Sequence, residues 1–353
     1  MVPSMVHKDN SVLQVVTDKN QWLHLLKEVG DFDFYHTHDY HSLSKLEEEE
    51  PKLIVYRNQD KTILLPLLIR PVKNTKYFDA TSVYGYAGPL TKNITKEFDP
   101  RDFHLKLTSF LNDENIVSVF TRLNPFIPYQ KQVLKELGNI DELGKVVYID
   151  LMQEESDQIS GYSKITKRYL KKLEKLCYVK RSNHQKDILK FVNLYYENMD
   201  RVDAGSEYYF EESYFFKLVN SSEFQAELVF IHMKDTHKAI AAAIIVKTNG
   251  AIVQYHISGT LMKHLKISPI RFLIHKMRMN SVEENYRFFN LGGGLGGQND
   301  SLFQFKSSFS KNYRNFGVWK FVVDQNVYSD LCKKNIMGVN KKVKDFFPLY
   351  RAK

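Results

Sequence analysis

The chain has 353 residues, of which 43% are hydrophobic and 26% charged, so it is long enough for two domains with their own cores. Fifty Lys and Arg against 41 Asp and Glu give a net charge of +9, which favours an anionic partner such as a nucleotide, a coenzyme phosphate or RNA. Cys177 and Cys332 lack the spacing of a zinc site or a disulfide scaffold. The opening MVPSMVHKDN lacks the apolar core of a signal peptide, and no segment approaches the roughly 20 apolar residues of a membrane span. We therefore expect a cytoplasmic protein.

The first half of the chain alternates strand and helix signals. A helix is predicted over residues 21–29, and apolar alternation predicts a hairpin of residues 52–57 and 62–70 around Asn58-Gln59-Asp60. Pro66, in the second arm, has no N–H for the ladder, so we expect an edge strand or a bulge there. An aromatic, glycine-rich loop follows. The next signals are a helix at 103–111, a strand at 116–121, a helix at 129–137 and a strand at 146–151.

The second half repeats this plan. Strands are predicted at 226–233, 238–247 and 251–258, the latter two joined by Thr248-Asn249-Gly250, and a helix from 270 to about 284 leads to a strand at 287–291. Each half places an antiparallel meander before a helix and a strand. We therefore predict an α/β (α+β) fold with two tandem domains, 1–150 and 151–325, whose mixed, largely antiparallel sheets are flanked by helices. Residues 326–353, with the basic tail 333–344, are expected to form a terminal helix packed on the body.

The segment GYSKITKRYLKKLEKLCYVKR carries the strongest charge signal. It predicts an amphipathic helix with Ser163 as its N-cap. Its apolar face would hold Ile165, Tyr169, Leu173 and Leu176. Arg168 or Lys167 could grip a phosphate, since only Glu174 offsets the cluster. The alternative is a solvated basic face.

A glycine cluster, LGGGLGG, follows the strand at 287–291. It contains a formal G-x-G-x-x-G, but only residues 301–309 could form the helix after it, and the preceding strands form a meander, so a dinucleotide site is the weaker alternative. Glycines such as Gly293 and Gly294 more simply remove side chains where a substrate approaches the backbone, or permit positive φ at a sharp turn.

Two side chains near this cluster are candidates for chemistry. Lys306 stands among aromatic residues, where it could snorkel to solvent or stabilise an oxyanion or a phosphate. The strand 251–258 places Gln254, His256 and Ser258 on one polar face, and His256 is a candidate proton acceptor. No spacing typical of a metal site and no G-x-S-x-G elbow occurs, which favours direct transfer without a covalent enzyme intermediate.

Several segments, taken in order, resemble the FemAB-like and BioF2-like branch of the GNAT acyltransferase superfamily. They are YFDATSVYGYAGPL, FTRLNPF, VVYIDL with the basic segment, FVNLYYENMDRVDA with YYF, and FNLGGGLGGQNDSLFQFKSSF. The resemblance implies two GNAT-like domains in a cytoplasmic enzyme that transfers an acyl or aminoacyl group to an amine of a cell-envelope precursor. It gives acyl-CoA or aminoacyl-tRNA as the donor. The usual pyrophosphate loop should fall at residues 264–270, where HLKISPI lacks its glycines.

The resemblance also implies roles for single residues. Phe305 and Lys306 match the Phe-Lys of the family's closing motif, with Lys306 contacting the donor or the developing oxyanion. Tyr84, Tyr86, Arg122 and Asn124 would line the acceptor side. Arg168 would meet a phosphate, and Tyr208, in the YYF run, would join the substrate-binding residues.

Three hypotheses follow. The first is an N-acyltransferase that uses acyl-CoA, such as acetyl-CoA, on a nucleotide-linked or lipid-linked sugar or peptide precursor in polysaccharide or envelope biogenesis. The second is an aminoacyltransferase of the FemX type that uses aminoacyl-tRNA. The third is a non-catalytic RNA-binding or scaffold protein that retains the fold. We expect neither a metal nor a DNA partner.

Overall fold

The computed structural model describes residues 11–248, 251–335 and 346–352. The opening MVPSMVHKDN, Asn249-Gly250 of the expected turn and most of the basic tail lie outside these residues. By contacts between residues the chain divides into two units. The first holds the described residues up to Asp31, Ser44–Glu142 and the described residues from Gly317 onward, and the second holds Phe32–Leu43 and Leu143–Phe316. The boundaries predicted near residues 150 and 325 stay a prediction.

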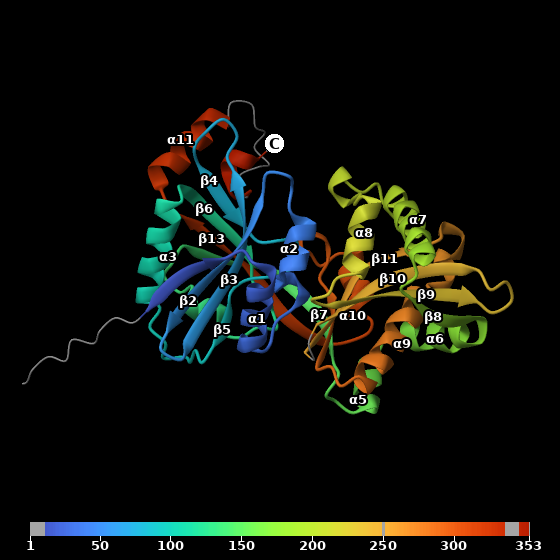
Figure 1. The fold of residues 1–353 in the computed structure, drawn as a ribbon. Helices are drawn as coiled ribbons and strands as arrows, with labels where there is room; N and C mark the ends of the chain where they lie inside the picture. Colours follow the sequence, from blue (N-terminus) through green and yellow to red (C-terminus); the bar gives the residue numbers. More distant parts are fainter. Residues whose placement is uncertain (1–10, 249–250, 336–345, 353) are drawn as a thin grey trace, which may run out of the picture. The chain divides into compact units, whose positions relative to one another are not determined.

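The first unit is built on a mixed sheet with the strand order β1-β2-β3-β4-β6-β13, with β5 paired to β3 (Figure 1). Its strands are β1 Val12–Val16, β2 Glu50–Asn58, β3 Lys61–Pro71, β4 Phe78–Thr81, β5 Leu90–Lys92, β6 Ile116–Arg122 and, from Gly317 onward, β13 Asn312–Val322. Its helices are α1 Lys19–Val29, α3 Arg101–Asp113, α4 Gln130–Val133 and α11 Gln325–Asn335, with a 3-10 turn η6 at Leu349–Arg351. The helix predicted over 129–137 is thus one short turn.

The predicted hairpin of the first unit is confirmed as β2 and β3, but the expectation for Pro66 was wrong. β3 is an interior strand, and Pro66 pairs in register with Leu53 of β2. On its other side β3 pairs with β5 at Thr62–Leu64 and with β4 at Leu68–Pro71, and Pro66 falls between the two stretches. A missing donor is tolerated there because no neighbouring strand meets β3 at that point.

The second unit contains a sheet with the strand order β7-β12-β11-β10-β9-β8 (Figure 1). Its strands are, from Leu143 onward, β7 Asn139–Asp150, and then β8 Cys177–Ser182, β9 Gln225–Met233, β10 Ala239–Thr248, β11 Ile252–Thr260 and β12 Phe288–Gly292. Its α-helices are α2 His38–Ser44, α5 Glu155–Ser160, α6 Lys164–Leu176, α7 Gln185–Arg201, α8 Glu212–Val219, α9 Ile270–Glu283 and α10 Ser301–Ser307. Its 3-10 turns are η1 Phe34–His36, η2 Ser206–Tyr208, η3 Met262–Ile267 and η4 Leu295–Gly297.

Helices cover both faces of the second sheet. α6 and α9 lie on one face, where Leu173 and Leu273 join a core with alternate residues of β9, β10 and β11. α7 and α8 lie on the other face, against β9, β10 and β11. Covering both faces explains why β10 is apolar almost throughout, since neither of its faces meets water.

The predicted repetition of one architecture is confirmed. In each unit antiparallel strands lead to a crossover helix, α3 or α9, and then to a parallel strand, so that β4 pairs with β6 and β11 pairs with β12. A further antiparallel strand then completes each sheet. β13 Asn312–Val322 pairs with β6, and β7 Asn139–Asp150 pairs with β12. The prediction of mixed, largely antiparallel sheets flanked by helices is therefore correct.

α6 begins as expected, with the Ser163 side chain accepting from the backbone N–H of Thr166 at 3.1 Å. The expected apolar face needs a correction, because Ile165 is 55% exposed while Thr166 and Leu173 are buried. The buried stripe is shifted by one residue at the start of the helix, since Thr166 supplies a hydroxyl that pairs with Ser308 across the packing contact.

Candidate functional site

Lys306 is a buried lysine on α10. Its Nζ donates to the carbonyl oxygen of Gly293 at 2.7 Å, and its side chain is 8% exposed. Burial lowers the pKa of Lys306 to about 8, although the Asp300 carboxylate partly opposes the shift. An ammonium has three N–H donors, and Gly293 is its one hydrogen-bond acceptor among the described residues. Two donors therefore remain for a ligand, and Lys306 does not snorkel to solvent.

The glycine cluster shapes the backbone around Lys306. Gly292 has φ +80°, and a Cβ there would lie 3.1 Å from Lys306 Nζ. A Cβ on Gly293 would lie 2.8 Å from the carbonyl oxygen of Lys145, and one on Gly294 would collide with Gln298 and with the Asp300 carboxylate. These glycines thus allow close packing of the chain on itself, as well as positive φ. A role for Gly293 and Gly294 in binding substrate stays a prediction.

Lys306 lies beside the point where two parallel strands part. β11 and β12 pair only over Ile252–Gln254 and Phe288–Asn290, whereas β11 continues to Thr260 and β12 ends at Gly292. In sheets of this kind ligands bind outside the carboxyl ends of adjacent parallel strands. The glycine turn and Lys306 stand at that end of β12.

A buried chain of polar side chains leads to the same turn. Gln254 donates to Asp33 at 2.6 Å and accepts from Asn290 at 2.8 Å, and Asn290 accepts from the backbone N–H of Gly292 at 2.9 Å. All three side chains are at most 3% exposed. Gln254 was predicted to bind substrate, but both ends of its amide are used within the protein. These contacts tie β11 to β12, and a contact of Gln254 with substrate stays a prediction.

His256 sits among aromatic rings on the face of the sheet covered by α7 and α8. Its Nε2 lies 3.1 Å from the hydroxyl of Tyr214, and the rings of Phe34, Tyr35 and Tyr40 surround it. Burial lowers the pKa of His256 to about 4. α10 packs on the opposite side, where Phe305 and Phe309 join the core under α6 and α9. No hydrogen bond among the described residues joins His256 to Lys306, and a catalytic role for His256 stays a prediction without supporting contacts.

The predicted polar face of β11 is interrupted by a bulge at His256. Ile244 pairs with Ile257 whereas Ile245 pairs with Tyr255, so His256 is left between the two pairs. Beyond the bulge the alternation reverses, and the Tyr255 hydroxyl donates to Ser258 at 2.5 Å. Ser258 therefore lies on the side of Tyr255, not on that of His256 and Gln254 as expected.

The neighbours of Lys306 on α10 are held by an arginine that the sequence analysis did not single out. The Arg271 guanidinium lies 4.9 Å from the ring centre of Phe305 and donates to the hydroxyls of Thr166 and Ser308 at 2.5 and 2.7 Å. It has no carboxylate partner among the described residues, and its Nε is buried without an acceptor. Phe305 thus packs against Arg271 and Phe309, which fixes the orientation of α10.

The predicted phosphate-binding pair stands on α6. Arg168 is exposed and lies 6.0 Å from the ring of Tyr169, and Lys167 is half-buried. Tyr208, at the end of η2, accepts from the hydroxyl of Tyr195 through its backbone oxygen at 2.6 Å. No contact assigns a substrate role to these three residues, which stay predictions.

In the first unit, the predicted acceptor-side residues fall into two groups. Tyr84 is 61% exposed, and the Arg122 guanidinium lies 5.5 Å from its ring centre. Arg122 is half-buried and has no carboxylate partner among the described residues, so its guanidinium remains suited to an anion. Asn124 is 3% exposed and is bound to the backbone, donating to Tyr86 and accepting from Phe126. Asn124 and Tyr86 therefore shape the loop, and their contact with substrate stays a prediction.

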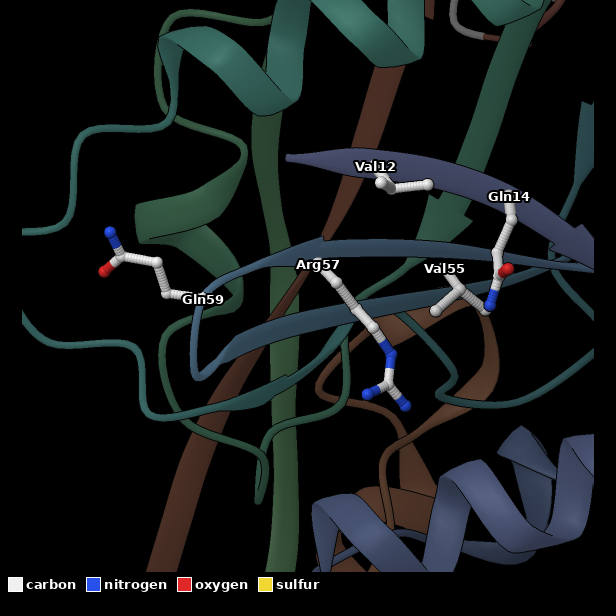
Figure 2. A pocket seen from close by; sticks show the side chains of 5 residues that line it. All are labelled: Val12, Gln14, Val55, Arg57 and Gln59. Atoms are coloured by element: carbon white, nitrogen blue, oxygen red, sulfur yellow. The ribbon is translucent and has the colours of Figure 1, made fainter. Parts of the chain in front are cut away.

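Two surface hollows lie apart from these side chains. The first, on β1 and β2, is lined by Val12, Gln14, Val55, Arg57 and Gln59 (Figure 2). Arg57 is already paired with Glu28 at 2.7 Å. The second is lined by residues of α5 and its surroundings, including Gln153, Asp157 and Lys311. No predicted site residue lines either hollow.

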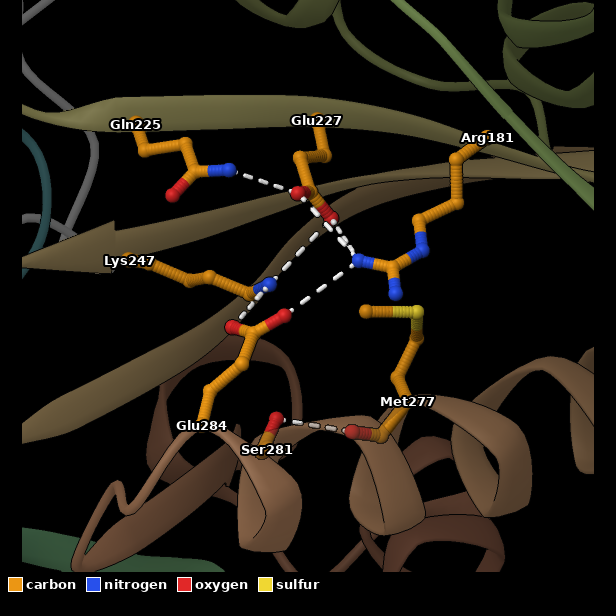
Figure 3. A network of polar contacts seen from close by, with 7 residues as sticks. All are labelled: Arg181, Gln225, Glu227, Lys247, Met277, Ser281 and Glu284. Atoms are coloured by element: carbon orange, nitrogen blue, oxygen red, sulfur yellow. Dashed lines mark hydrogen bonds and ion pairs between the residues drawn. The ribbon is translucent and has the colours of Figure 1, made fainter.

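A buried network of charges occupies the second unit at the end of β10 (Figure 3). The fully buried Lys247 donates to Glu284 at 2.6 Å and to Glu227 at 3.3 Å, and Arg181 bridges the same two carboxylates. Two positive and two negative charges thus balance within the protein, and Gln225 also donates to Glu227. Because each of these charges has a partner of opposite sign within the protein, we assign the network a structural role.

Two absences concern the described residues alone. Within them, no group of three or more His, Cys, Asp or Glu side chains could hold a metal ion. Over the same ranges, none of the helices has the length and apolar character that crossing a bilayer demands.

The structure is similar to several solved structures. It matches FemX with a TM-score of 0.68 and 12% identity over 90% of this chain and 99% of that chain. It matches L-PGS from Bacillus licheniformis with a TM-score of 0.56 and 12% identity, covering 90% and 96% of the two chains. It also matches the C-terminal domain of a putative lysylphosphatidylglycerol synthetase from Agrobacterium fabrum, with a TM-score of 0.56 and 11% identity over 88% and 93%.

These likenesses establish the fold. The chain has the FemX fold along nearly its whole length, and the resemblance to FemAB-like GNAT proteins is confirmed at that level. No protein-family model matches the sequence, and no curated protein matches it.

Sequence reasoning missed Asp33, Asn290 and Arg271. Asp33 is separated from its partner Gln254 by 221 residues, so no local pattern could join them. Arg271 lies two residues after Pro269, in the first turn of α9. In the sequence it stood out only as a basic residue in an otherwise apolar turn.

Proposed function

We propose that this chain is an N-acyltransferase that transfers an activated acyl group to an amino group of a cell-envelope sugar or peptidoglycan precursor. The observation that carries the proposal is the buried ammonium of Lys306, which uses one donor on Gly293 and keeps two for a ligand beside the parting strands β11 and β12. The shared fold with FemX supports it.

The chemistry follows from that position. The neutral amine of the acceptor attacks the carbonyl carbon of a thioester or ester, a C–N bond forms, and the carbonyl oxygen becomes an oxyanion. Lys306 donates to that oxyanion. The C–S or C–O bond then breaks, and the leaving group takes the proton that the amine loses. Positioning and oxyanion stabilisation account for the rate, and removing one such donor typically costs about 100- to 1,000-fold.

Acyl-CoA, such as acetyl-CoA, is the first candidate donor, and aminoacyl-tRNA is the second. One observation favours the second. His264 and its neighbours form η3 without the glycines of the usual pyrophosphate loop, which counts against ordinary CoA binding. Both donors present an activated carbonyl, so the role of Lys306 is the same for each.

On the acceptor side, the exposed Tyr84 and the half-buried Arg122 of the first unit suit a phosphorylated precursor, whether nucleotide-linked or lipid-linked. A guanidinium stacked on an aromatic ring keeps its N–H edge available for phosphate oxygens. Arg122→Ala should therefore raise KM for the acceptor more than it lowers kcat.

Thermal unfolding with acyl-CoAs and with charged tRNA identifies the donor, because a ligand that binds only the folded state raises its apparent stability. Transfer to amino-sugar nucleotides and peptidoglycan precursors is then followed by mass spectrometry. Lys306→Ala should lower kcat/KM by about 100-fold or more. Lys311→Ala is the matched control, since Lys311 also donates to a backbone carbonyl, that of Ser307. Unchanged kcat/KM in Lys306→Ala would refute the assignment, and absence of transfer with every donor would favour a non-catalytic protein.

A further inference from the structure

The exposed face of α6 carries positive charge that nothing in the described protein balances. Four of its cations follow one another at spacings of three or four residues and therefore share a face. They are Lys164, Arg168, Lys171 and Lys175, with Lys172 beside them. All five are exposed, and none has a carboxylate partner among the described residues. Glu174 is the only acidic residue on the helix.

The turn η3 lies beside this helix. The hydroxyl of Tyr169 donates to the backbone oxygen of Lys266 at 3.4 Å, which brings α6 and η3 together. In a 3-10 turn residues three apart share one of three sides. Met262 and Leu265 share one side, and Lys263 and Lys266 share the next. Met262 is 59% and Leu265 37% exposed. The nearby carboxylate of Glu197 is bound to the backbone N–H of Met262 at 2.8 Å.

Ile165 adds another exposed apolar side chain on α6. It stands one turn before Tyr169 on α6 and is 55% exposed, against the expectation that it would be buried. Three large apolar side chains are thus exposed on two neighbouring elements, which together carry seven cations that have no carboxylate partner among the described residues. We call Ile165, Met262 and Leu265 with the surrounding lysines and Arg168 the α6–η3 surface.

We propose that the α6–η3 surface docks on the headgroup layer of an anionic membrane. Amphipathic elements with Lys and Arg beside exposed apolar side chains bind such layers, where the cations meet lipid phosphates and the apolar residues enter the interface. RNA backbone would satisfy the cations but would leave Ile165, Met262 and Leu265 without a partner. The apolar residues therefore favour lipid, and docking would bring the enzyme to acceptors held at the membrane.

Vesicle co-sedimentation of the full chain tests the proposal. The probes are phosphatidylcholine vesicles with and without about a third phosphatidylglycerol, and the wild type should bind only the anionic vesicles. Lys164→Glu/Lys171→Glu/Lys175→Glu should reduce partitioning at least about tenfold, since each cation near the surface contributes to binding. Met262→Ser/Leu265→Ser should weaken binding several-fold at unchanged charge.

The matched control is Lys73→Glu/Lys96→Glu/Lys186→Glu, which makes the same change in net charge at exposed lysines elsewhere. It should bind as the wild type does. Equal loss in the control would overturn the proposal in favour of a net-charge effect. Unaltered vesicle binding by Met262→Ser/Leu265→Ser would overturn the proposal that these apolar side chains enter the membrane interface. Binding of tRNA without any binding of anionic vesicles would assign the surface to RNA. Circular dichroism verifies that each variant folds.

Discussion

Lys306 Nζ and the carbonyl oxygen of Gly293 lie 2.7 Å apart, and this hydrogen bond joins α10 to the turn after β12. Burial lowers the pKa of the ammonium to about 8, with Asp300 acting in the opposite direction. We expect lysine-selective 15N NMR to show the Lys306 signal titrating near pH 8. The donor to an oxyanion is then present at pH 7 and is lost as the pH rises through 8.

The sign for stability follows from proton binding. Between pH 8 and the unfolded value of about 10.4, the unfolded chain holds a proton on Lys306 that the folded chain has lost. The contribution of Lys306 to the free energy of unfolding therefore rises with pH across that window. Lys306→Met removes this contribution, and urea unfolding at pH 8 and 10 measures it. A lysine that titrates above pH 10 would contradict the burial that the structure shows.

Gly294 and Gly296 should respond differently to alanine. A Cβ on Gly294 would collide with Gln298 and with the Asp300 carboxylate, which caps α10 by accepting from the N–H of Phe303. Gly296 has φ +59° but open space, so alanine there costs only about 1 kcal/mol of backbone strain. We expect Gly294→Ala to lower the free energy of unfolding by at least about 2 kcal/mol. Urea denaturation compares the two variants, and equal losses would argue against a packed turn.

Asn290 links the buried chain of amides to the glycine turn. Replacing Asn290 by alanine removes the partner of the Gln254 side-chain oxygen and of the Gly292 N–H. We therefore expect the free energy of unfolding to fall by about 1–3 kcal/mol. Gln254→Ala removes a neighbour in the same chain. In a double-mutant cycle the two changes should couple by about 0.5–3 kcal/mol, and strictly additive effects would contradict a connected network.

Lys247 is the buried cation of the network in Figure 3. Lys247→Met leaves Glu227 and Glu284 with Arg181 alone, and we expect it to cost about 3–5 kcal/mol. Arg181→Met is the milder comparison, because the Arg181 side chain is 40% exposed. Adding Glu227→Gln to Lys247→Met should restore part of the loss. Thermal unfolding compares the stabilities of the three variants. A larger loss of stability in Arg181→Met than in Lys247→Met would contradict the assignment of Lys247 as the central cation of the network.

Local patterns predicted most strands and helices of this fold. The hairpin of β2 and β3 follows from apolar alternation on either side of Asn58-Gln59-Asp60, and the Ser163 cap follows from its place before a helical period. Pro66 was placed wrongly because its tolerance depends on a gap between β5 and β4, which no local sequence reveals.

The site was predictable in part. Lys306 was singled out from its place after the glycines, and the structure shows it buried beside them. The surroundings of His256 were not predictable, because they depend on a bulge in β11 and on rings contributed by residues 34–40. Asn124 and Gln254 look like ligand-binding amides in sequence, but their partners are protein groups that folding brings to them.

The strand β13 has a consequence for synthesis of the chain. Val318–Val322 complete the sheet of the first unit beside β6, and Trp319 is fully buried in its core, with its indole N–H donating to the carbonyl of Leu137. A ribosome that has made the first 150 residues has therefore exposed an incomplete sheet edge and an unfilled core. The first unit to be translated can therefore finish folding only after nearly all of the second unit has emerged from the ribosome. Until residue 322 has been synthesised, the edge of β6 has no partner strand and is open to incorrect pairing.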